Sequence, residues 1–176
     1  MKSTSKHYLS NRVFKVNVGF LLSAGPGNYQ DSRFDILTPV QLSDDLIVNA
    51  VEGSLRLTRA KEGVLVQARL AVEADNTCSR CLDVVAQTLA IDVEELFAYP
   101  ASNISEFSVG GDAILDLAPL LRAEVLIGMS YRVLCREDCR GLCAECGTNL
   151  NHNTCYCAVE KIDPRLAKLK ELLDNK

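Results

Sequence analysis

Apolar and polar positions alternate through the segment VLVQARLAVEAD in the middle of the chain. The even-numbered positions from Val64 to Ala74 are apolar, whereas odd-numbered positions such as Arg69 and Glu73 are charged. Side chains of a strand point alternately to its two faces. The segment is therefore predicted to be a strand of an antiparallel sheet, with one face buried and the other in water.

Similar segments lie on both sides of this strand. The stretch 46–58 (LIVNAVEGSLRLT) is rich in apolar residues, and 85–97 returns to an alternating pattern. Short turn-forming sequences separate the three segments, and Cys78 and Cys81 fall in the second of these turns. We therefore expect an antiparallel β-meander over about residues 46–98, with the two cysteines near a hairpin turn.

Two helices are predicted after the meander. Asp116 can cap a helix over residues 117–129, in which Pro119 falls in the first turn and removes no intrahelical hydrogen bond. Asp163 can cap a second helix over residues 164–173, whose leucines lie on one stripe. Each helix thus has one apolar side to pack against another element.

The predicted elements place the chain in the α+β class. We expect a flexible N-terminus at residues 1–12, an α+β domain at 13–130, and a Cys-rich zinc-binding segment with a C-terminal helix at 131–176. The domain is expected to begin with a strand or short amphipathic segment at 13–22. Its architecture would be an antiparallel β-meander with a packed helix.

Composition and charge narrow the class of protein. Hydrophobic residues make up 48% and charged residues 24% of the chain, which is typical of a folded, water-soluble protein. The apolar run near the N-terminus is interrupted by Lys15 and Asn17, so it makes a poor export signal, and no stretch is long enough to cross a membrane. We expect a cytoplasmic protein without a membrane partner, whose thiols are reduced or metal-bound. The formal net charge of -4 gives no general attraction for nucleic acid.

Six of the eight cysteines lie in the short stretch 135–157. Cys143 and Cys146 form a Cys-x2-Cys pair, and the following Gly147 can adopt positive φ so that the chain curls round an ion. A tetrahedral Zn²⁺ site on this pair needs two more thiolates. The spacing leaves open which two of the flanking cysteines supply them: Cys135, Cys139, Cys155 and Cys157.

Cys78 and Cys81 form another Cys-x2-Cys pair, outside this cluster. They could belong to a second metal site, or be a separate pair of turn cysteines without a ligand role, because no further donor adjoins them. The expected cofactor is one Zn²⁺, with enough cysteines for a second ion. The metal is expected to be structural, since the Cys-rich segment has few large apolar residues of its own.

Disulfides and redox chemistry are the alternatives to metal binding. A disulfide framework is disfavoured by the poor export signal and by the tight Cys-x2-Cys loops. A redox switch is a stronger competitor, because a zinc centre that combines Cys-x2-Cys with Cys-x-Cys resembles redox-regulated chaperones in which oxidation ejects the ion. A thioredoxin-type site is disfavoured at Cys78 and Cys81, which lie between predicted antiparallel strands.

No catalytic constellation accompanies the cysteines. The sequence contains no nucleophile elbow, phosphate-binding loop or dinucleotide fingerprint. Its two histidines are His7 in the N-terminal tail and His152 in a loop, where a solvated side chain is expected rather than a ligand. We therefore expect a protein that is not an enzyme and has no small-molecule substrate.

Several motifs occur together in one order: TCSRCLDVV, VEELF, ILDLAPLLRAEVLIGM, CREDCRGLCAECGTNLNHNTCYC and IDPRLAKL. With this order and spacing, the chain resembles the YceD family, the large ribosomal RNA subunit accumulation proteins of bacteria and plastids, over about residues 13–173. The resemblance implies a non-enzymatic role in ribosome biogenesis, in support of the accumulation or maturation of 23S rRNA. Some members of that family keep the early Cys-x2-Cys and lack the late cluster. This implies a purpose for Cys78 and Cys81 separate from the late zinc site.

The implied partners are a pre-ribosomal particle, rRNA or a ribosomal protein. Arg132, Arg136 and Arg140 recur every four residues beside the cysteine cluster and could contact RNA phosphate or an acidic protein surface, although a solvated basic face is an equal alternative. Residues 132–170 carry seven Lys and Arg against five Asp and Glu. Four thiolates around one Zn²⁺ would cancel this excess, because such a centre carries a net charge of about −2. The rival functions are a redox-sensing zinc protein and a zinc-dependent protein-interaction module.

Overall fold

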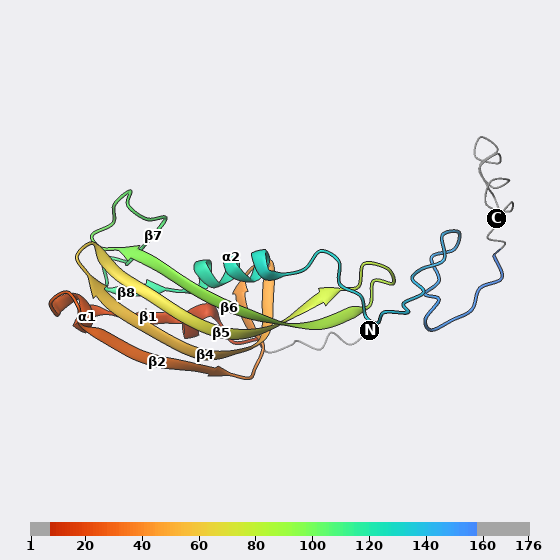
Figure 1. The fold of residues 1–176 in the computed structure, drawn as a ribbon, viewed down its shortest axis with the longest axis horizontal. Coiled ribbons are helices and arrows are strands. Elements are labelled where there is room, and N and C mark those ends of the chain that lie inside the picture. The colour runs from red at the N-terminus through yellow and green to blue at the C-terminus, as the bar shows by residue number, and fades with distance from the viewer. Residues whose placement is uncertain (1–7, 158–176) are drawn as a thin grey trace, which may run out of the picture.

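A six-stranded sheet dominates the fold (Figure 1). The structure, a computed structural model, describes residues 8–157, so the helix predicted at 164–173 lies outside the described residues. The strand order is β2-β4-β5-β6-β7, with β3 also paired to β4. The strands are β2 (Tyr29–Ile36), β3 (Val40–Ser43), β4 (Leu46–Ala60), β5 (Gly63–Thr77), β6 (Val84–Ala98) and β7 (Phe107–Ser108).

The three long strands follow one another in the chain and pair in antiparallel fashion. β4 pairs with β5 in a register that sets Leu57 opposite Val66, and β5 pairs with β6 from Gly63↔Ala98 to Thr77↔Val84. Along β5 the even-numbered residues from Val64 to Ala74 are buried, as the alternating pattern predicts. The apolar face of the sheet therefore lines the main core.

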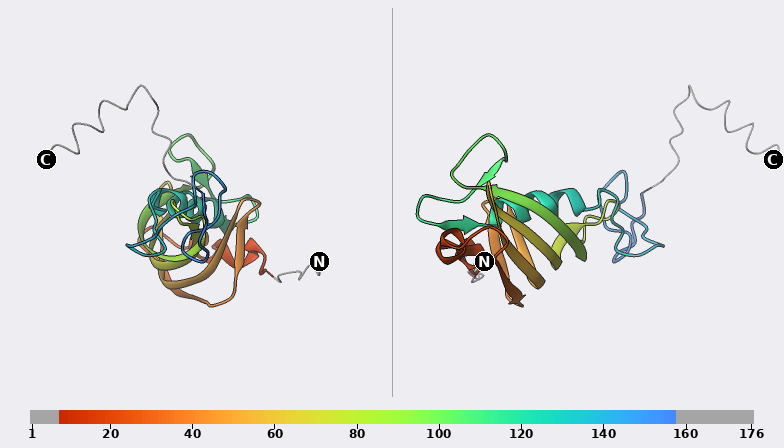
Figure 2. Two further views of the ribbon diagram at one scale, coloured as in Figure 1. Left: turned by 90° about the vertical axis from the view of Figure 1, so that its right-hand side faces the viewer. Right: turned by 60° about the vertical axis from the view of Figure 1, so that its left-hand side comes forward.

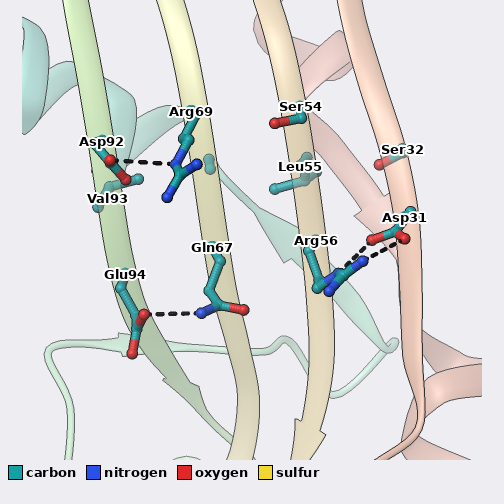
Figure 3. Close-up of a pocket in the computed structure, with 11 residues that line it drawn as sticks. Asp31, Ser32, Ser54, Leu55, Arg56, Gln67, Arg69, Asp92, Val93 and Glu94 are labelled. Carbon is teal, nitrogen blue, oxygen red and sulfur yellow. Dashed lines mark hydrogen bonds and ion pairs between the residues drawn. The ribbon is translucent and has the colours of Figure 1, made fainter.

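The opposite face of the sheet is polar, and two ion pairs join neighbouring strands there (Figure 3). Arg56 donates two hydrogen bonds to Asp31 at 2.6 and 2.8 Å, and Arg69 lies 3.3 Å from Asp92. These residues line a shallow groove of about 550 Å³. Strand β2, on the edge of this face, is almost wholly exposed. Its sequence YQDSRFDI has no apolar alternation, so the sequence pattern predicts no strand there.

The segment predicted as one element at 13–22 is divided into three short ones. They are the 3₁₀ helix η1 (Asn11–Phe14), strand β1 (Lys15–Asn17) and helix α1 (Gly19–Ser23). β1 pairs antiparallel with β8 (Ile114–Asp116), which the sequence analysis did not predict. The two strands form a separate small sheet.

Helix α2 (Ala118–Gly128) follows β8 directly. The carboxylate of Asp116 accepts a hydrogen bond from the backbone N–H of Ala118 at 3.0 Å, so it satisfies one of the free donors at the helix start. Leu121 and Val125 are buried in the main core with the strands. Beyond α2 the chain runs back along the sheet toward the turn between β5 and β6.

That turn and the chain after α2 form a cysteine-rich lobe, defined here as residues 77–84 and 130–157. The lobe lies at one end of the long strands, and α1 lies at the opposite end (Figures 1 and 2). A fold of mainly antiparallel sheet with helix α2 and cysteine groups near its C-terminal part agrees with the predicted α+β class. Within residues 8–157, no helix is long and apolar enough to cross a membrane.

Candidate metal centres

The eight cysteines of the chain gather in two groups of four in the lobe. Site one contains Cys78, Cys81, Cys135 and Cys139, and site two contains Cys143, Cys146, Cys155 and Cys157. In each group the four sulfur atoms lie within 4.8 Å of one another. Each group could therefore hold one metal ion.

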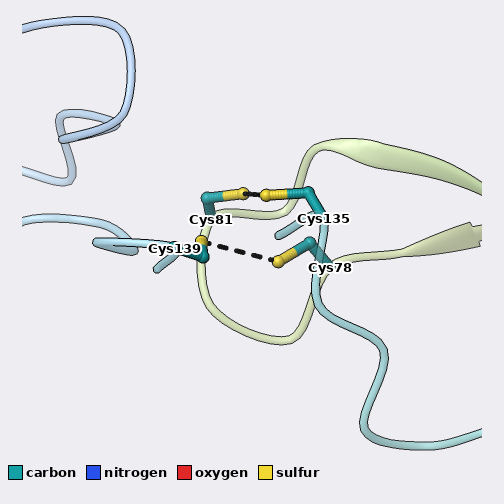
Figure 4. A group of neighbouring side chains, drawn as sticks. All are labelled: Cys78, Cys81, Cys135 and Cys139. Carbon is teal, nitrogen blue, oxygen red and sulfur yellow. Dashed lines mark hydrogen bonds between the residues drawn. The ribbon is translucent and has the colours of Figure 1, made fainter. Parts of the chain in front are cut away.

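Site one joins two segments that are far apart in the sequence (Figure 4). Cys78 and Cys81 lie in the turn between β5 and β6, where the backbone N–H of Cys78 donates to the carbonyl of Asp83 at 2.8 Å. Cys135 and Cys139 come from the chain that follows α2. A backbone hydrogen bond of 2.8 Å from Ser79 to Val133 holds the two segments together.

The sulfur distances in site one fit a tetrahedral ion. Cys81 Sγ lies 3.5 Å from Cys135 Sγ, and Cys78 Sγ lies 3.8 Å from Cys139 Sγ. A zinc–sulfur bond of about 2.3 Å gives a regular tetrahedron with sulfur–sulfur edges of about 3.8 Å. The donor set and its spacing therefore match what Zn²⁺ takes in structural sites.

Site one is also the better shielded of the two groups. Cys78, Cys81 and Cys139 are buried, and with Val85 and Leu134 they form a small second core. Outside the sulfurs, the Asn151 amide donates to Cys139 Sγ at 3.3 Å and Arg80 donates to the Cys139 carbonyl at 3.1 Å. Such donors orient a thiolate and offset its charge.

Site two is local, since all four ligands fall within one short segment. Gly147, with φ of +70°, directly follows Cys146, and its N–H donates to the Cys143 carbonyl at 2.9 Å. The N–H of Cys143 donates to the Thr148 carbonyl at 2.8 Å. These bonds fold residues 143–148 into the tight turn that the Cys-x2-Cys-Gly motif predicts. Cys146 is exposed and Cys155 and Cys157 are half-buried, so this site is open to solvent on one side.

Asp83 connects the two sites. Its carboxylate accepts hydrogen bonds from Cys81 Sγ at 3.2 Å and from the Asn149 amide at 3.0 Å, and it lies 3.0 Å from His152 Nε2. The hydrogen bond from Cys81, together with those from Asn149 and His152, holds the pKa of the Asp83 carboxyl below its usual range. The backbone N–H of Leu142 also donates to the Arg80 carbonyl at 3.1 Å. Site two is thereby held against the hairpin turn that supplies half of site one.

The thiols within each site differ in their tendency to ionise. A hydrogen bond from the Cys81 backbone lowers the pKa of Cys78 to about 6, and one from Thr148 lowers the pKa of Cys146 to about 6. By contrast, burial raises the pKa of Cys81, and the neighbouring Cys146 raises the pKa of Cys157 to about 12. The hydrogen bond from Asn151 lowers the pKa of Cys139 as well. Each group thus offers at least one thiol that ionises more readily than usual, to which an arriving cation can bind first.

The two groups bear on the question that cysteine spacing left open, namely which cysteines lie with Cys143 and Cys146. Cys155 and Cys157 lie with Cys143 and Cys146, whereas Cys135 and Cys139 lie with Cys78 and Cys81. The early pair thus lies with two cysteines of the late cluster, in a different group from Cys143 and Cys146. The spacing of the cysteines could not reveal this pairing. The pairing depends on how the sheet strands and helix α2 bring residue 135 back to residue 81.

The three arginines that recur every four residues lie in the chain that follows α2. Residues 131–140 form bends and turns rather than a helix, so Arg132, Arg136 and Arg140 do not share a helical face. Arg136 lies 3.3 Å from Asp138 and donates to the Asn151 side chain at 2.9 Å. His152 contacts Asp83 and is not part of either group of four.

Three polar residues around the sites were not singled out by sequence reasoning: Asp83, Asn149 and Asn151. The two asparagines lie in the Asn-rich run NLNHN, which is typical of any turn, and Asp83 ends the turn segment CSRCLD.

The fold and the sites define a small β-sheet protein with a lobe of two four-cysteine groups. The chain belongs to the YceD family: residues 66–173 match the family described as large ribosomal RNA subunit accumulation protein YceD. An uncharacterized protein of Mycobacterium tuberculosis is 33% identical over 162 residues, which cover 86% of this chain and 78% of that protein. An uncharacterized protein of Mycobacterium leprae is 30% identical, over 97% of this chain and 82% of its own length. No solved structure is similar to the chain.

Proposed function

We propose that the protein is a non-enzymatic ribosome-biogenesis factor that supports the accumulation or maturation of 23S rRNA. The observation that carries this proposal is membership of the YceD family, whose description names large ribosomal RNA subunit accumulation. A role in assembly also suits the shallow groove on the polar face of the sheet, which is lined mainly by paired charges rather than by a nucleophile and base. The protein would act in the cytoplasm on a pre-ribosomal particle.

We propose further that each four-cysteine group holds one Zn²⁺. Four thiolates at tetrahedral spacing are the donor set of structural zinc, and neither site contains a weaker ligand that water or substrate could replace. The ion would supply folding free energy and no reaction step. At site one it would fasten the lobe to the β5–β6 hairpin, and at site two it would fold the tip of the lobe.

Depletion of the protein tests the proposed function. Cells lacking it are expected to accumulate less 23S than 16S rRNA, with a deficit of large subunits in sucrose gradients, and the full-length chain should restore both. A variant with Cys81→Ser and Cys135→Ser should restore them poorly if an ordered lobe is needed. Normal 23S levels and normal subunit profiles after depletion would contradict the proposal.

Redox sensing is a second candidate, favoured by the two cross-segment sulfur pairs at 3.5 and 3.8 Å. Hydrogen peroxide can oxidise two such thiols to one disulfide with release of two waters, and an ion held by them would then leave. Mild peroxide should in that case release zinc and change association with ribosomal particles together. If neither the metal content nor the association changes, this function is excluded.

A further inference from the structure

Metal binding would change the charge of the cysteine-rich lobe. Without metal the lobe has a formal net charge of zero, because it contains as many arginines as acidic residues. The arginines are Arg80, Arg132, Arg136 and Arg140, and the acidic residues are Asp83, Glu137, Asp138 and Glu145. A divalent ion bound by four thiolates leaves a net charge of about −2 per site. Two filled sites therefore bring the lobe to about −4 and the whole chain, formally -4, to about −8.

This charge is unfavourable for contact with an RNA backbone. Phosphate binding requires free cationic groups that displace counterions. In the lobe Arg136 is engaged with Asp138, and Arg80 donates to the Cys139 carbonyl beside site one. The remaining arginines, Arg132 and Arg140, would lie close to the two negatively charged metal centres. A cationic partner suits the metal-loaded lobe better than a polyanion.

The lobe also presents the two most exposed large hydrophobic side chains among residues 8–157. Tyr131 is 95% exposed and Tyr156, between the ligands Cys155 and Cys157, is 100% exposed. Leu82 and Val84 at the hairpin turn are exposed as well. Single exposed apolar residues are ordinary, but tyrosines are enriched in binding hot spots, and an aromatic face attracts ammonium and guanidinium groups.

We propose that the metal-loaded lobe is a docking surface for a Lys- and Arg-rich segment of a protein partner. The cationic side chains of that segment would be attracted by the negative charge of the two metal centres and of Glu137, Asp138 and Glu145. They would also stack on the rings of Tyr131 and Tyr156. This inference rests on the proposed function, because proteins that coat rRNA need basic segments to neutralise phosphate. The lobe would hold such a segment before or during its transfer to the RNA.

The polar face of the sheet is a poorer site for the same partner. Its groove is lined by charges that already bind one another, as in the pairs Arg56–Asp31 and Arg69–Asp92. A cationic segment would have to break these pairs. This face therefore serves as an internal control for the effect of charge alone.

Peptide binding to the full-length, zinc-loaded chain tests the proposal. The probes are a labelled twelve-residue peptide of alternating Lys, Arg and Gly, and a labelled twelve-nucleotide uridine RNA, each measured by fluorescence anisotropy at several salt concentrations. We expect the peptide to bind more tightly than the RNA, and its affinity to fall when a chelator removes the metal. Tighter binding of RNA, or peptide affinity that does not depend on metal, would overturn the proposal.

Two sets of variants separate a docking surface from non-specific charge attraction. Tyr131→Ala with Tyr156→Ala should weaken peptide binding about 5- to 10-fold, given the usual strength of exposed cation–π contacts. Phe20→Ala, which removes an aromatic ring that is 82% exposed on α1 at the other end of the molecule, should leave affinity unchanged. Equal effects of the two changes would contradict a docking role for the lobe tyrosines.

The second set removes three negative charges from either region. Glu137→Gln, Asp138→Asn and Glu145→Gln alter the lobe, whereas Asp35→Asn, Glu52→Gln and Glu73→Gln alter the sheet. The lobe set should weaken peptide binding clearly more than the sheet set; equal weakening would overturn the proposal. The proposed function is tested separately by 23S rRNA levels, so a failure of peptide docking with normal dependence of 23S rRNA on this chain removes the docking proposal alone.

Discussion

Loss of site one should destabilise the sheet, whereas loss of site two should not. Site one joins Cys81 to Cys135, which are 54 residues apart, and the chain between them includes β6, β7, β8 and α2. Cross-linking a loop of that length lowers the conformational entropy of the unfolded chain. In the loop-entropy treatment used for disulfides, this raises the free energy of the unfolded chain by about 4 kcal/mol. A metal held by the two segments acts in the same way.

The local site offers a matched comparison. Cys146 and Cys155 are nine residues apart, so closing their loop is worth about 2.5 kcal/mol, and the loop contains no strand or core residue. The variant with Cys81→Ser and Cys135→Ser removes one cross-segment pair, and the variant with Cys146→Ser and Cys155→Ser removes the corresponding local pair. Both lose two thiols, but only the first removes a cross-link between residues 130–157 and the turn 77–84.

Urea unfolding followed by the far-ultraviolet circular dichroism of the sheet measures the difference. With an m-value of about 2 kcal/mol per molar urea, a loss of 4 kcal/mol lowers the midpoint of the site-one variant by about 2 M. The site-two variant should keep its sheet transition within about 0.5 M of the parent chain. Equal shifts for the two variants, or no shift for the site-one variant, would refute the reasoning that site one fastens the lobe to the sheet.

Three further predictions concern single positions. Leu121→Ala leaves a cavity between α2 and the sheet and should lower the free energy of unfolding by about 2 to 5 kcal/mol in urea melts, whereas Leu126→Ala on the exposed side of the same helix should cost less than about 1 kcal/mol. Gly147→Ala forces a side chain onto positive φ and should cost about 1 kcal/mol, seen as faster zinc loss from site two to a chromogenic chelator; an unchanged rate would contradict this. Hydrogen bonds from Arg122 hold the pKa of Asp45 below its usual range, so the pair stabilises the fold above about pH 4 and the effect is lost as pH falls through the lowered value. In zinc-free protein, Arg122→Gln should therefore make Tm less dependent on pH in that acidic range, and an unaltered dependence would refute this role for the pair.

The alternation of apolar and polar residues predicted the central strands of the sheet, because burial along these strands repeats every second residue. From Val64 to Ala74 every second side chain is buried, and the same rule holds on β6 from Leu89 to Phe97 with one exception, Glu95. The edge strand β2 escaped prediction since only Phe34 and Ile36 near its end pack against the core and the rest of the strand is exposed. Its position comes from backbone pairing with β4, which does not depend on side-chain type.

The two cysteine groups show the same division between local and long-range information. Site two could be anticipated in part, because Cys143, Cys146 and Gly147 form a turn by themselves and need ligands from nearby. Site one could not, because the meeting of Cys81 with Cys135 is produced by the length of β6 and the return path through α2. Sequence spacing between cysteines carries information only where the intervening chain is short.

The number of metal ions per chain tests the central claim most directly. Native mass spectrometry of the full-length protein, with zinc also measured by elemental analysis, should give two ions per chain. The variants Cys81→Ser with Cys135→Ser and Cys146→Ser with Cys155→Ser should each retain one, because either site can form without the other. A single ion in the parent chain that survives loss of Cys81 and Cys135 would contradict the account and leave site one without a metal.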